Sequence, residues 1–298
     1  MRSLVKILKF IGYHPLASKN RLLAYSRFLS WQIRQRLRPR PEKVTFVESS
    51  VLIVERGMAG ATGNIYTGLQ EFNDMGFLLH VLRAGDTFVD IGANVGAYTI
   101  LAAKNVGAAV VSFEPIPSTF AKLQRNVDAN EVQGSVELKR YGVGDAAGTL
   151  RFTASMDSVN HVLTAHEQID GAGIVEVPVE TLDQLLQGRQ PVLFKMDVEG
   201  YEWPALNGAK SLLASPSLKA LIIELNGSGH RYGYDEKTIH ALLVTYGFVP
   251  YRYEPFSRQL KKEPDYYGPD NTIYIRDVEW VEGRVKAARK YRVLNVNV

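Results

Sequence analysis

The residues best suited to chemistry lie in one short segment, residues 87–99, in which an apolar run leads through Asp90 into a turn punctuated by glycines. Residues 88–91 have the composition of a buried strand, and Gly92 and Gly96 permit a tight turn and a close approach of the backbone to a ligand. A helix that follows directly would aim its free amide groups at that ligand. The segment therefore predicts a site for a cofactor held through backbone contacts.

A second acidic residue follows at the distance that this arrangement requires. Residues 109–113 form another apolar run that ends at Glu114, which lies 22 residues beyond Gly92 and is followed by Pro115. Two parallel strands that flank one crossover helix have this spacing, and an acid at the tip of the second strand accepts both hydroxyls of a ribose. The two motifs together predict a cofactor that contains adenosine.

The glycine spacing indicates which cofactor this is. A dinucleotide-binding loop has the pattern Gly-x-Gly-x-x-Gly, whereas the middle position here is Asn94. The looser turn, with Asp90 two residues before the first glycine, favours S-adenosylmethionine, whose ammonium group would lie near Asp90. The predicted contacts of the loop are Gly92, Ala93, Asn94, Gly96 and Tyr98. The structural alternative is an Asp that caps a helix without any ligand.

Four separated runs of the chain together resemble FkbM-type S-adenosylmethionine-dependent methyltransferases. These runs are residues 88–99, 112–115, 181–183 and 195–202, and the likeness covers roughly residues 57–275. The resemblance implies an α/β fold of the class I methyltransferase (Rossmann-like) type, with a seven-stranded sheet, mostly parallel with the last strand antiparallel, and helices on both faces. It also implies O-methylation of a hydroxyl on a sugar or a natural product.

Further ligand contacts are expected on either side of the central motifs. In this architecture the segment before the first core strand often folds over the cofactor, which makes Tyr66 and Glu71 candidates at the methionine end. The turn at residues 142–145 lies where such folds meet the adenine, so we expect Gly144 and Asp145 there. A core-facing Tyr66 and a plain turn at Asp145 are the structural alternatives. The polar insertion at residues 155–173, with Asn160, His161 and His166, is expected to recognise the acceptor.

The acceptor chemistry is expected where a later strand ends, in residues 195–202. Methyl transfer to a hydroxyl needs an in-line approach, a group that takes the proton, and exclusion of water. The candidate catalytic residues are Asp197, Glu199, Glu224 and His230. Asp197, Glu224 and Asn226 also offer hard oxygen ligands on adjacent strands, so a Mg²⁺ ion that activates the hydroxyl is an alternative. His230 is equally well explained as a surface residue, and Lys195 as the structural partner of an acid.

The composition supports one large domain with an N-terminal extension. The chain has 298 residues, 46% of them hydrophobic, which is enough for a substantial core. Pro39 and Pro41 mark the boundary. We therefore expect a basic amphipathic extension at residues 1–43 and the methyltransferase domain at residues 44–298. Because the chain contains no cysteine, disulfides, thiolate zinc sites and cysteine nucleophiles are excluded, in agreement with a reducing compartment.

Positive charge is concentrated in the extension. It contains eleven Lys or Arg residues and a single acid, Glu42, a net charge of +10, while the whole chain carries +4. Apolar residues interleave with these charges, as in a helix that lies on an anionic membrane surface. Packing on the domain or on a second subunit is the structural alternative, which leaves a homo-oligomer open. Binding of nucleic acid is the least favoured use.

The N-terminal extension also indicates where in the cell the protein is expected. No apolar run approaches the length of a spanning helix, and the N-terminal sequence lacks the features of a signal peptide. We therefore expect a cytoplasmic protein that contacts the inner face of the membrane through residues 1–40.

These features favour one function and leave two alternatives. The favoured function is S-adenosylmethionine-dependent O-methyl transfer to a sugar, a glycan, a glycolipid or a related small metabolite. The alternatives are methylation of a polyketide or peptide natural product, and membrane-associated binding without turnover. No nucleic-acid acceptor is expected, because Asp-Val-Glu-Gly follows the strand where amino-methylating enzymes present Asn or Asp with Pro-Pro and an aromatic residue. Cytosine C5 methylation is excluded because it needs a cysteine.

Overall fold

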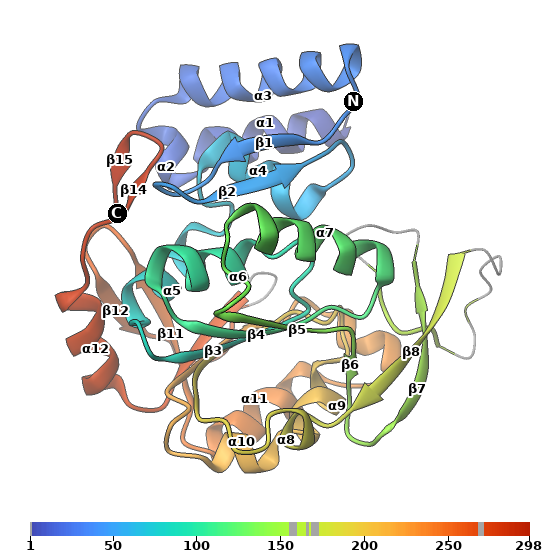
Figure 1. Cartoon of the computed structure of the whole chain (residues 1–298). Coiled ribbons are helices and arrows are strands. Elements are labelled where there is room, and N and C mark those ends of the chain that lie inside the picture. The colour runs from blue at the N-terminus through green and yellow to red at the C-terminus, as the bar shows by residue number, and fades with distance from the viewer. Residues whose placement is uncertain (1, 155–159, 165–166, 168–172, 268–270) are drawn as a thin grey trace.

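An eight-stranded mixed sheet forms the centre of the protein (Figure 1). The computed structural model describes residues 2–154, 160–164, 167, 173–267 and 271–298. The strand order is β12-β11-β13-β10-β9-β3-β4-β5. The strands are β3 (Thr87–Ile91), β4 (Ala109–Phe113), β5 (Val136–Lys139), β9 (Pro191–Met196), β10 (Ala220–Glu224), β11 (Val249–Glu254), β12 (Gln259–Lys262) and β13 (Asn271–Ile275).

The directions of the strands confirm the predicted fold class. β5, β4, β3, β9 and β10 run parallel, and β13 is inserted antiparallel between β10 and β11. The sheet has eight strands rather than the expected seven, because β12 pairs antiparallel with the edge of β11. The sequence of β12, Gln-Leu-Lys-Lys, lacks the apolar alternation that marks a strand, and lysines are typical of exposed sheet edges.

Helices cover both faces of the sheet, as predicted (Figure 1). One face carries α5 (Phe72–Val81), α6 (Ala97–Ile100) with its π-helical continuation η1 (Leu101–Val106), and α7 (Pro117–Ala129). The other carries α8 (Leu182–Leu185), α9 (Glu202–Asn207), α10 (Lys210–Ala214) and α11 (Glu236–Thr245). Alternating strand residues supply the two cores: Phe88 packs with the first set of helices, and Val89 and Ile91 pack with the second. α12 (Val278–Ala287) packs into the first core.

The N-terminal segment folds as a helical layer on the first face. It consists of α1 (Arg2–Tyr13), α2 (Pro15–Ser18), α3 (Arg21–Leu37), the hairpin β1 (Glu42–Thr45) and β2 (Val51–Val54), and α4 (Ala59–Thr67). Ile11, Ala24 and Trp31 are buried in the same cluster as the domain core. Because β1 begins at Glu42, the boundary expected after residue 43 falls inside a hairpin. The segment with Gly60 and Gly63 forms α4, since packing overrides low helix propensity.

A second, three-stranded sheet lies beside the carboxyl edge of the first (Figure 1). It consists of β6 (Gly142–Val143), β7 (Gly148–Thr153) and β8 (Ile174–Glu180), with β8 in the middle. The remaining elements are the 3₁₀ helix η4 (Ser228–Tyr232) after β10 and the hairpin β14 (Arg292–Val293) and β15 (Val296–Asn297). Among the described residues, no helix combines the length and apolarity needed to cross a membrane.

Candidate active site

One cavity of about 380 Å³ lies where the parallel strands β3, β4, β9 and β10 end. Residues at or directly after the end of each of these strands line it. The predicted site residues in its wall are Glu71, Asp90, Gly92, Ala93, Asn94, Tyr98, Glu114, Pro115, Asp197, Glu199, Glu224 and Asn226. Segments far apart in sequence thus meet at the carboxyl edge of the sheet, where open α/β folds bind their ligands.

The turn after β3 is the tightest part of the cavity wall. Gly92 has a φ of +79°, and a Cβ atom built on it would lie 1.8 Å from the backbone oxygen of Asp197. The amides of Gly92 and Ala93 both donate to the Phe113 carbonyl, at 3.0 and 2.9 Å. Only glycine fits here, because the neighbouring atom belongs to backbone and cannot rotate away. The turn is therefore locked between the ends of β4 and β9.

Glu114 is buried at the end of β4 and braces the same turn. Its Oε2 accepts a hydrogen bond from the Asn94 amide, and its Oε1 accepts one from the Ile116 amide, both at 3.0 Å. Burial raises the pKa of Glu114 to about 8, against the lowering effect of the two amides. Because a carboxylate has about four lone-pair sites, two remain for hydroxyl donors of a ligand.

Asp90 and Lys195 are partners in register on the adjacent strands β3 and β9. The Thr99 hydroxyl donates to Asp90 Oδ2 at 2.6 Å, and Lys195 Nζ donates to Asp197 Oδ2 at 3.2 Å. Burial raises the pKa of Asp90 to about 6, with the bond from Thr99 and the charge of Lys195 acting against it. The lysine inside the apolar strand thus has the acidic partner that the sequence led us to expect.

Three carboxylates gather beside this lysine. One oxygen each of Asp197, Glu199 and Glu224 lies within 4.8 Å of the others. Burial, followed by the charge of Asp197, raises the pKa of Glu199 to about 7 and that of Glu224 to about 9. Burial acts to lower the pKa of Lys195, but the charges of Asp197, Glu71 and Glu224 raise it above its usual value. Near neutral pH Glu224 therefore holds a proton and Glu199 is about half protonated, beside a charged lysine.

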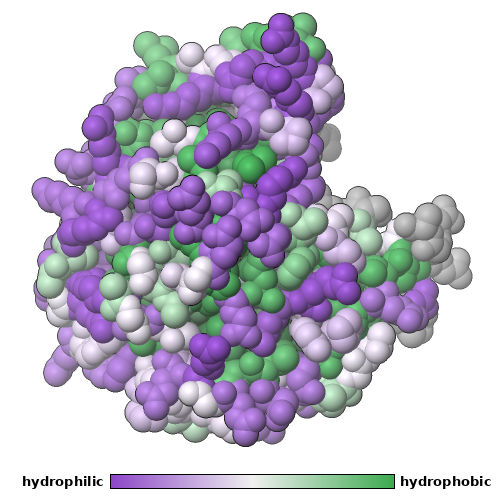
Figure 2. All heavy atoms as spheres, in the orientation of Figure 1, coloured by the Kyte–Doolittle hydropathy of each residue, from purple (hydrophilic) through white to green (hydrophobic). Residues whose placement is uncertain are grey.

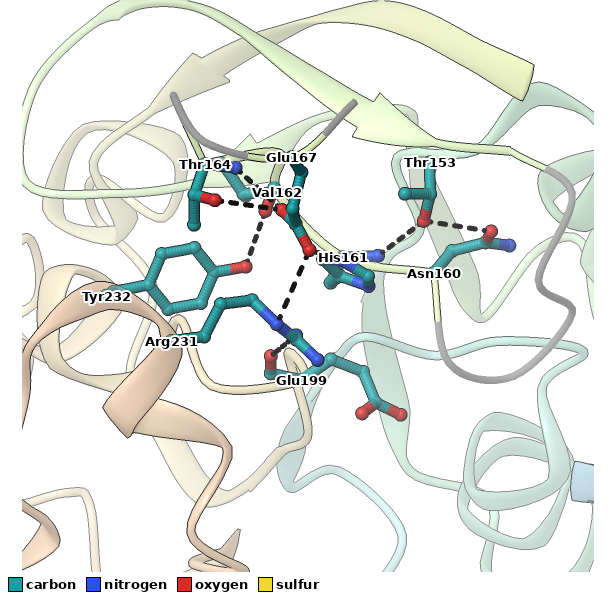
Figure 3. A network of polar contacts seen from close by, with 9 residues as sticks. All are labelled: Thr153, Asn160, His161, Val162, Thr164, Glu167, Glu199, Arg231 and Tyr232. Atoms are coloured by element: carbon teal, nitrogen blue, oxygen red, sulfur yellow. Dashed lines mark hydrogen bonds and ion pairs between the residues drawn. The ribbon is translucent and has the colours of Figure 1, made fainter. Parts of the chain in front are cut away.

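A polar network joins the loop after β10 to the segment between β7 and β8 (Figure 3). Arg231 in η4 donates to the Glu199 carbonyl at 3.1 Å, and its Nε lies 3.9 Å from Glu167 Oε1. Glu199 has a φ of +55°, in the left-handed region that few side chains adopt without support. Arg231 therefore holds the strained turn after β9 and ties it to the insertion.

The same network anchors the part of the insertion that reaches the cavity (Figure 3). The Tyr232 hydroxyl donates to the Val162 carbonyl at 2.7 Å, and the Thr153 hydroxyl donates to Asn160 Oδ1 at 3.2 Å. Asn160 and Val162 line the cavity, whereas His161 is buried and its Nε2 lies 3.0 Å from Glu167 Oε1. The described part of the insertion thus forms a wall of the cavity, and its role in acceptor recognition stays a prediction. His166 lies outside the described residues.

Tyr66 and His230 lie away from the cavity. Tyr66 packs edge-to-face on Phe28, with ring centroids 5.1 Å apart, and its hydroxyl accepts a bond from Gln32 at 3.3 Å. It faces α3 because α4 is covered by the N-terminal helices, a layer that sequence patterns do not locate. His230 is exposed on η4. The structure places neither residue where its predicted role in cofactor binding or proton transfer requires it.

The end of the cavity near β6 also differs from expectation. Gly142 and Val143 line it, whereas the predicted pair Gly144 and Asp145 does not, and Asp145 is exposed. Gly142 and Val143 form β6 instead of the first half of the expected turn, so the predicted pair follows this strand outside the cavity wall. Gly96 lies behind the wall as the left-handed N-cap of α6, with a φ of +88°.

Several wall residues carried no signal in the sequence. They include Gln70, Met75, Thr119, Tyr141, Phe152 and Tyr201. Of these, only Tyr201 belongs to a segment that the sequence singled out. Phe152 reaches the cavity because the small β6-β8-β7 sheet folds against the end of the large one, a placement that strand patterns alone do not reveal.

Comparison with known proteins now adds to this geometry. The sequence profile of the methyltransferase FkbM domain matches residues 90–250, more than half of the chain and all four strand ends of the cavity. The chain belongs to the FkbM methyltransferase family. The family is one of methyltransferases, in agreement with the resemblance of the motifs.

Two curated FkbM-type relatives illustrate how far this similarity extends. The hexuronic acid methyltransferase AglP of Haloferax volcanii is 28% identical over 169 residues, which cover 56% of this chain and 64% of that protein. The 31-O-demethyl-FK506 methyltransferase FkbM of Streptomyces tacrolimicus is 38% identical over 90 residues, which cover 29% of this chain and 34% of that protein. The chain therefore matches less than two thirds of the length of each relative.

Solved structures resemble this member of the FkbM family only distantly. The precorrin-6y C5,15-methyltransferase of Geobacter metallireducens shares 11% identity at a TM-score of 0.41, covering 75% of this chain and 93% of the other. The fold assignment therefore rests on the strand order and on the FkbM family itself.

The cavity fits the cofactor of an FkbM methyltransferase. Its described lining contains six acidic residues and one basic residue, Lys195, which favours a ligand that carries a sulfonium and an ammonium group. Glu114 keeps two free lone pairs at the tip of β4, where a ribose could donate to them. The loop after β3, Asp90 and Glu114 are thus the residues that would hold S-adenosylmethionine.

Replacing Glu114 with Gln is expected to weaken binding of S-adenosylmethionine by about 1.5 to 3 kcal/mol, or roughly 10- to 150-fold, because the acceptor of two charge-assisted bonds is lost. Isothermal titration calorimetry measures this change. An unchanged dissociation constant would remove Glu114 from the ribose contacts.

The same variant has a stability signature in the free protein. The pKa of Glu114 is raised above its unfolded value, so its stabilising protonated form is fully present below the unfolded pKa of 4.5, and that stability is lost as the pH rises through about 8. Glu114→Gln should therefore gain about 2 °C or more in Tm relative to wild type at about pH 8.5, and less at about pH 5. Thermal melts at both pH values test this sign.

Proposed function

We propose that this methyltransferase transfers a methyl group to a hydroxyl oxygen of a sugar or of a metabolite that contains one. The observation that carries the proposal is the cluster of Asp197, Glu199 and Glu224 beside Lys195 in the cavity. A hydroxyl acceptor must lose a proton, and this cluster supplies the acceptor for it. The similarity to a hexuronic acid methyltransferase supports a sugar as the substrate class.

The cluster also favours a hydroxyl over a carboxylate as the methylated group. A carboxylate has no proton to give up, and it would add a negative charge beside the Asp197 carboxylate. A neutral hydroxyl meets neither difficulty. The wall formed by Asn160 and the glutamates offers hydrogen-bond partners to the other hydroxyls of a sugar ring.

Different residues of the chain have different roles in the proposed methyl transfer. Bound S-adenosylmethionine supplies the methyl group as an electrophilic carbon on its sulfonium. Asp197 accepts the proton of the acceptor hydroxyl, and Lys195 holds the Asp197 carboxylate in place at 3.2 Å. Glu224 lies at the end of the neighbouring strand β10, and one of its carboxyl oxygens lies within 4.8 Å of one of Asp197.

A natural-product hydroxyl is the second candidate acceptor. The match to the FK506 methyltransferase has the higher identity of the two relatives but covers only 29% of this chain. The described wall combines aromatic residues such as Tyr141, Phe152 and Tyr201 with polar ones, so it accommodates an apolar ring system as well as a sugar. Acceptor assays decide between them.

A Mg²⁺ ion stays a prediction, with an altered ligand set. Asn226 lines the cavity, but its Oδ1 already accepts a bond from the Ser228 amide at 2.9 Å. Asp197, Glu199 and Glu224 are the oxygen donors that would hold such an ion, which would lower the pKa of the acceptor hydroxyl. Lys195 already supplies one positive charge there. Activity after EDTA treatment, with and without added magnesium, tests the requirement.

The proposal is tested by transfer of labelled methyl from S-adenosylmethionine to neutral hexosides, uronic acids and macrolide alcohols. Label on a sugar that survives mild alkali is an ether and supports hydroxyl methylation. Label that alkali releases is an ester and would overturn it. Label on the macrolide alone would establish the natural-product alternative.

Replacing Arg231 with Ala is expected to raise the KM for the acceptor by about 5- to 30-fold, the size of one or two lost hydrogen bonds. Arg231 touches the Glu199 carbonyl and lies near Glu167, so its loss frees the insertion that forms the acceptor wall. Binding of S-adenosylmethionine should not change, because the cofactor loop lies on β3 and β4. Steady-state kinetics with each substrate varied in turn separate the two effects, and Arg231→Lys should restore part of the loss. A rise confined to the KM for the cofactor would contradict this role.

A further inference from the structure

Exposed apolar side chains are concentrated at the N-terminal end of the molecule. Among the described residues, eleven large hydrophobic side chains are exposed, and eight of them lie between residues 4 and 37. These are Leu4, Val5, Phe10, Tyr13, Leu22, Leu29, Ile33 and Leu37. In Figure 2 apolar atoms reach the surface in the upper part of the molecule, where Figure 1 shows α1 and α3. The proposed methyl transfer makes no use of this surface.

α3 carries apolar residues on two opposite faces. Its inner face, with Ala24, Phe28 and Trp31, is buried against the domain. Its outer face presents the four residues that we call the outer stripe: Leu22, Leu29, Ile33 and Leu37, which are 85%, 58%, 47% and 76% exposed. Their spacing of seven, four and four residues places them on one line along the helix. A solvent-exposed helix face is normally polar, so this stripe needs a partner.

The charge around the stripe limits what that partner is. Residues 1–43 carry eleven basic residues and one acid, and that acid, Glu42, pairs with Arg34 at 3.0 Å. Among the basic residues, Lys6 and Lys9 on α1 and Arg36, Arg38 and Arg40 at or just after the end of α3 are exposed. A second copy of the chain meeting this surface about a two-fold axis would set positive charge against positive charge. Nucleic acid would match the charge but has no use for a row of exposed leucines.

We propose that the outer stripe and the basic residues beside it dock the protein onto an anionic lipid bilayer. α3 has 17 residues and is about 25 Å long, so it lies in the plane of the interface with its leucines among the acyl chains. The arginines and lysines reach the lipid phosphates. Because the inner face stays packed on the domain, the whole enzyme is held at the surface. This inference does not depend on the identity of the acceptor.

Substitutions on the outer face test the proposal without disturbing the core. Deletion of the helices would be ambiguous, because Ile11, Ala24 and Trp31 belong to the buried cluster. The full chain is instead compared with the triple variant Leu22→Ser, Leu29→Ser and Leu37→Ser by co-sedimentation with phosphatidylcholine vesicles, with and without phosphatidylglycerol. Two single variants are also compared: Leu29→Glu on the outer stripe and, as the control, Val244→Glu on the distant helix α11. Both place a glutamate at an exposed apolar residue, since Leu29 is 58% exposed and Val244 is 46% exposed. Thermal melts confirm folding.

The wild type is expected to bind only vesicles that contain phosphatidylglycerol, and to release them as salt rises. The triple variant and Leu29→Glu should lower the bound fraction by about tenfold or more, while Val244→Glu should not. A quadruple variant with Lys6→Gln, Lys9→Gln, Arg36→Gln and Arg38→Gln should lose the preference for anionic lipid while its melting temperature stays unchanged. Equal binding by wild type and triple variant, or no binding by wild type, would overturn the proposal. A wild-type dimer that the triple variant dissociates would assign the stripe to a second copy instead.

Discussion

Replacing Asp197 with Asn is expected to lower kcat by about 100-fold or more, the range over which a positioned proton acceptor contributes to catalysis. The amide keeps the size of the side chain and a hydrogen-bond acceptor for Lys195, which lies 3.2 Å away, but it cannot take a proton. Binding of S-adenosylmethionine should change little, because the cofactor loop and Glu114 are untouched. Single-turnover rates and calorimetric titration of the same preparation measure the two quantities.

The matched control is Asp145→Asn. Asp145 follows β6 and is exposed outside the cavity, so the same chemical change there should leave binding and turnover as in wild type. If Asp197→Asn keeps most of its activity while Glu199→Gln loses it, the proton acceptor is Glu199. A loss of cofactor binding in Asp197→Asn would show that Asp197 serves the donor side of the cavity.

Replacing Gly92 with Ala is expected to destabilise the protein by about 3 kcal/mol or more and to abolish measurable cofactor binding. The new Cβ would lie 1.8 Å from the Asp197 carbonyl oxygen, so β3 and β9 must move apart at the point where the cavity is narrowest. The left-handed φ of +79° adds about 1 to 2 kcal/mol for a residue with a side chain. Urea unfolding and titration with S-adenosylmethionine provide the measurements.

Gly85→Ala separates the two contributions. Gly85 has a φ of +87° but no atom within 4 Å of a Cβ built on it, so its variant should show the backbone cost alone, about 1 to 2 kcal/mol. The difference between the two variants measures the steric contact with Asp197. Equal losses in both would mean that the wall opens freely and that Gly92 is not needed for close packing.

The cofactor side of this site could be predicted from the sequence because it is local. The end of β3, the turn at Gly92 and the acid after β4 all belong to one strand-helix-strand unit, whose geometry follows from spacing. Asp90 and Glu114 consequently lie in the predicted places. The strand ends that carry Asp197 and Glu224 were also predictable, since carboxyl ends of neighbouring parallel strands share one edge.

The rest depended on side-chain direction and on tertiary packing. Tyr66 faces Phe28 because α3 covers α4, and no local pattern reveals which helix covers another. Arg231 was not singled out, since its partners Glu167 and Glu199 lie 64 and 32 residues away in sequence. β12 was not predicted from the sequence, because a short, lysine-rich edge strand has the composition of a loop.

The network in Figure 3 has an evolutionary consequence. The part of the cavity assigned to the cofactor comes mainly from residues 88–115, whereas the wall at Asn160 and Val162 is held from outside by Arg231 and Tyr232 of η4. If this wall binds the acceptor, as we propose, a change of acceptor requires both segments to change together, since Arg231 and Tyr232 bind one to the other. An experiment that transfers acceptor specificity between relatives should therefore exchange both segments together. Exchanging one alone would remove the contacts that Arg231 and Tyr232 make with the other segment.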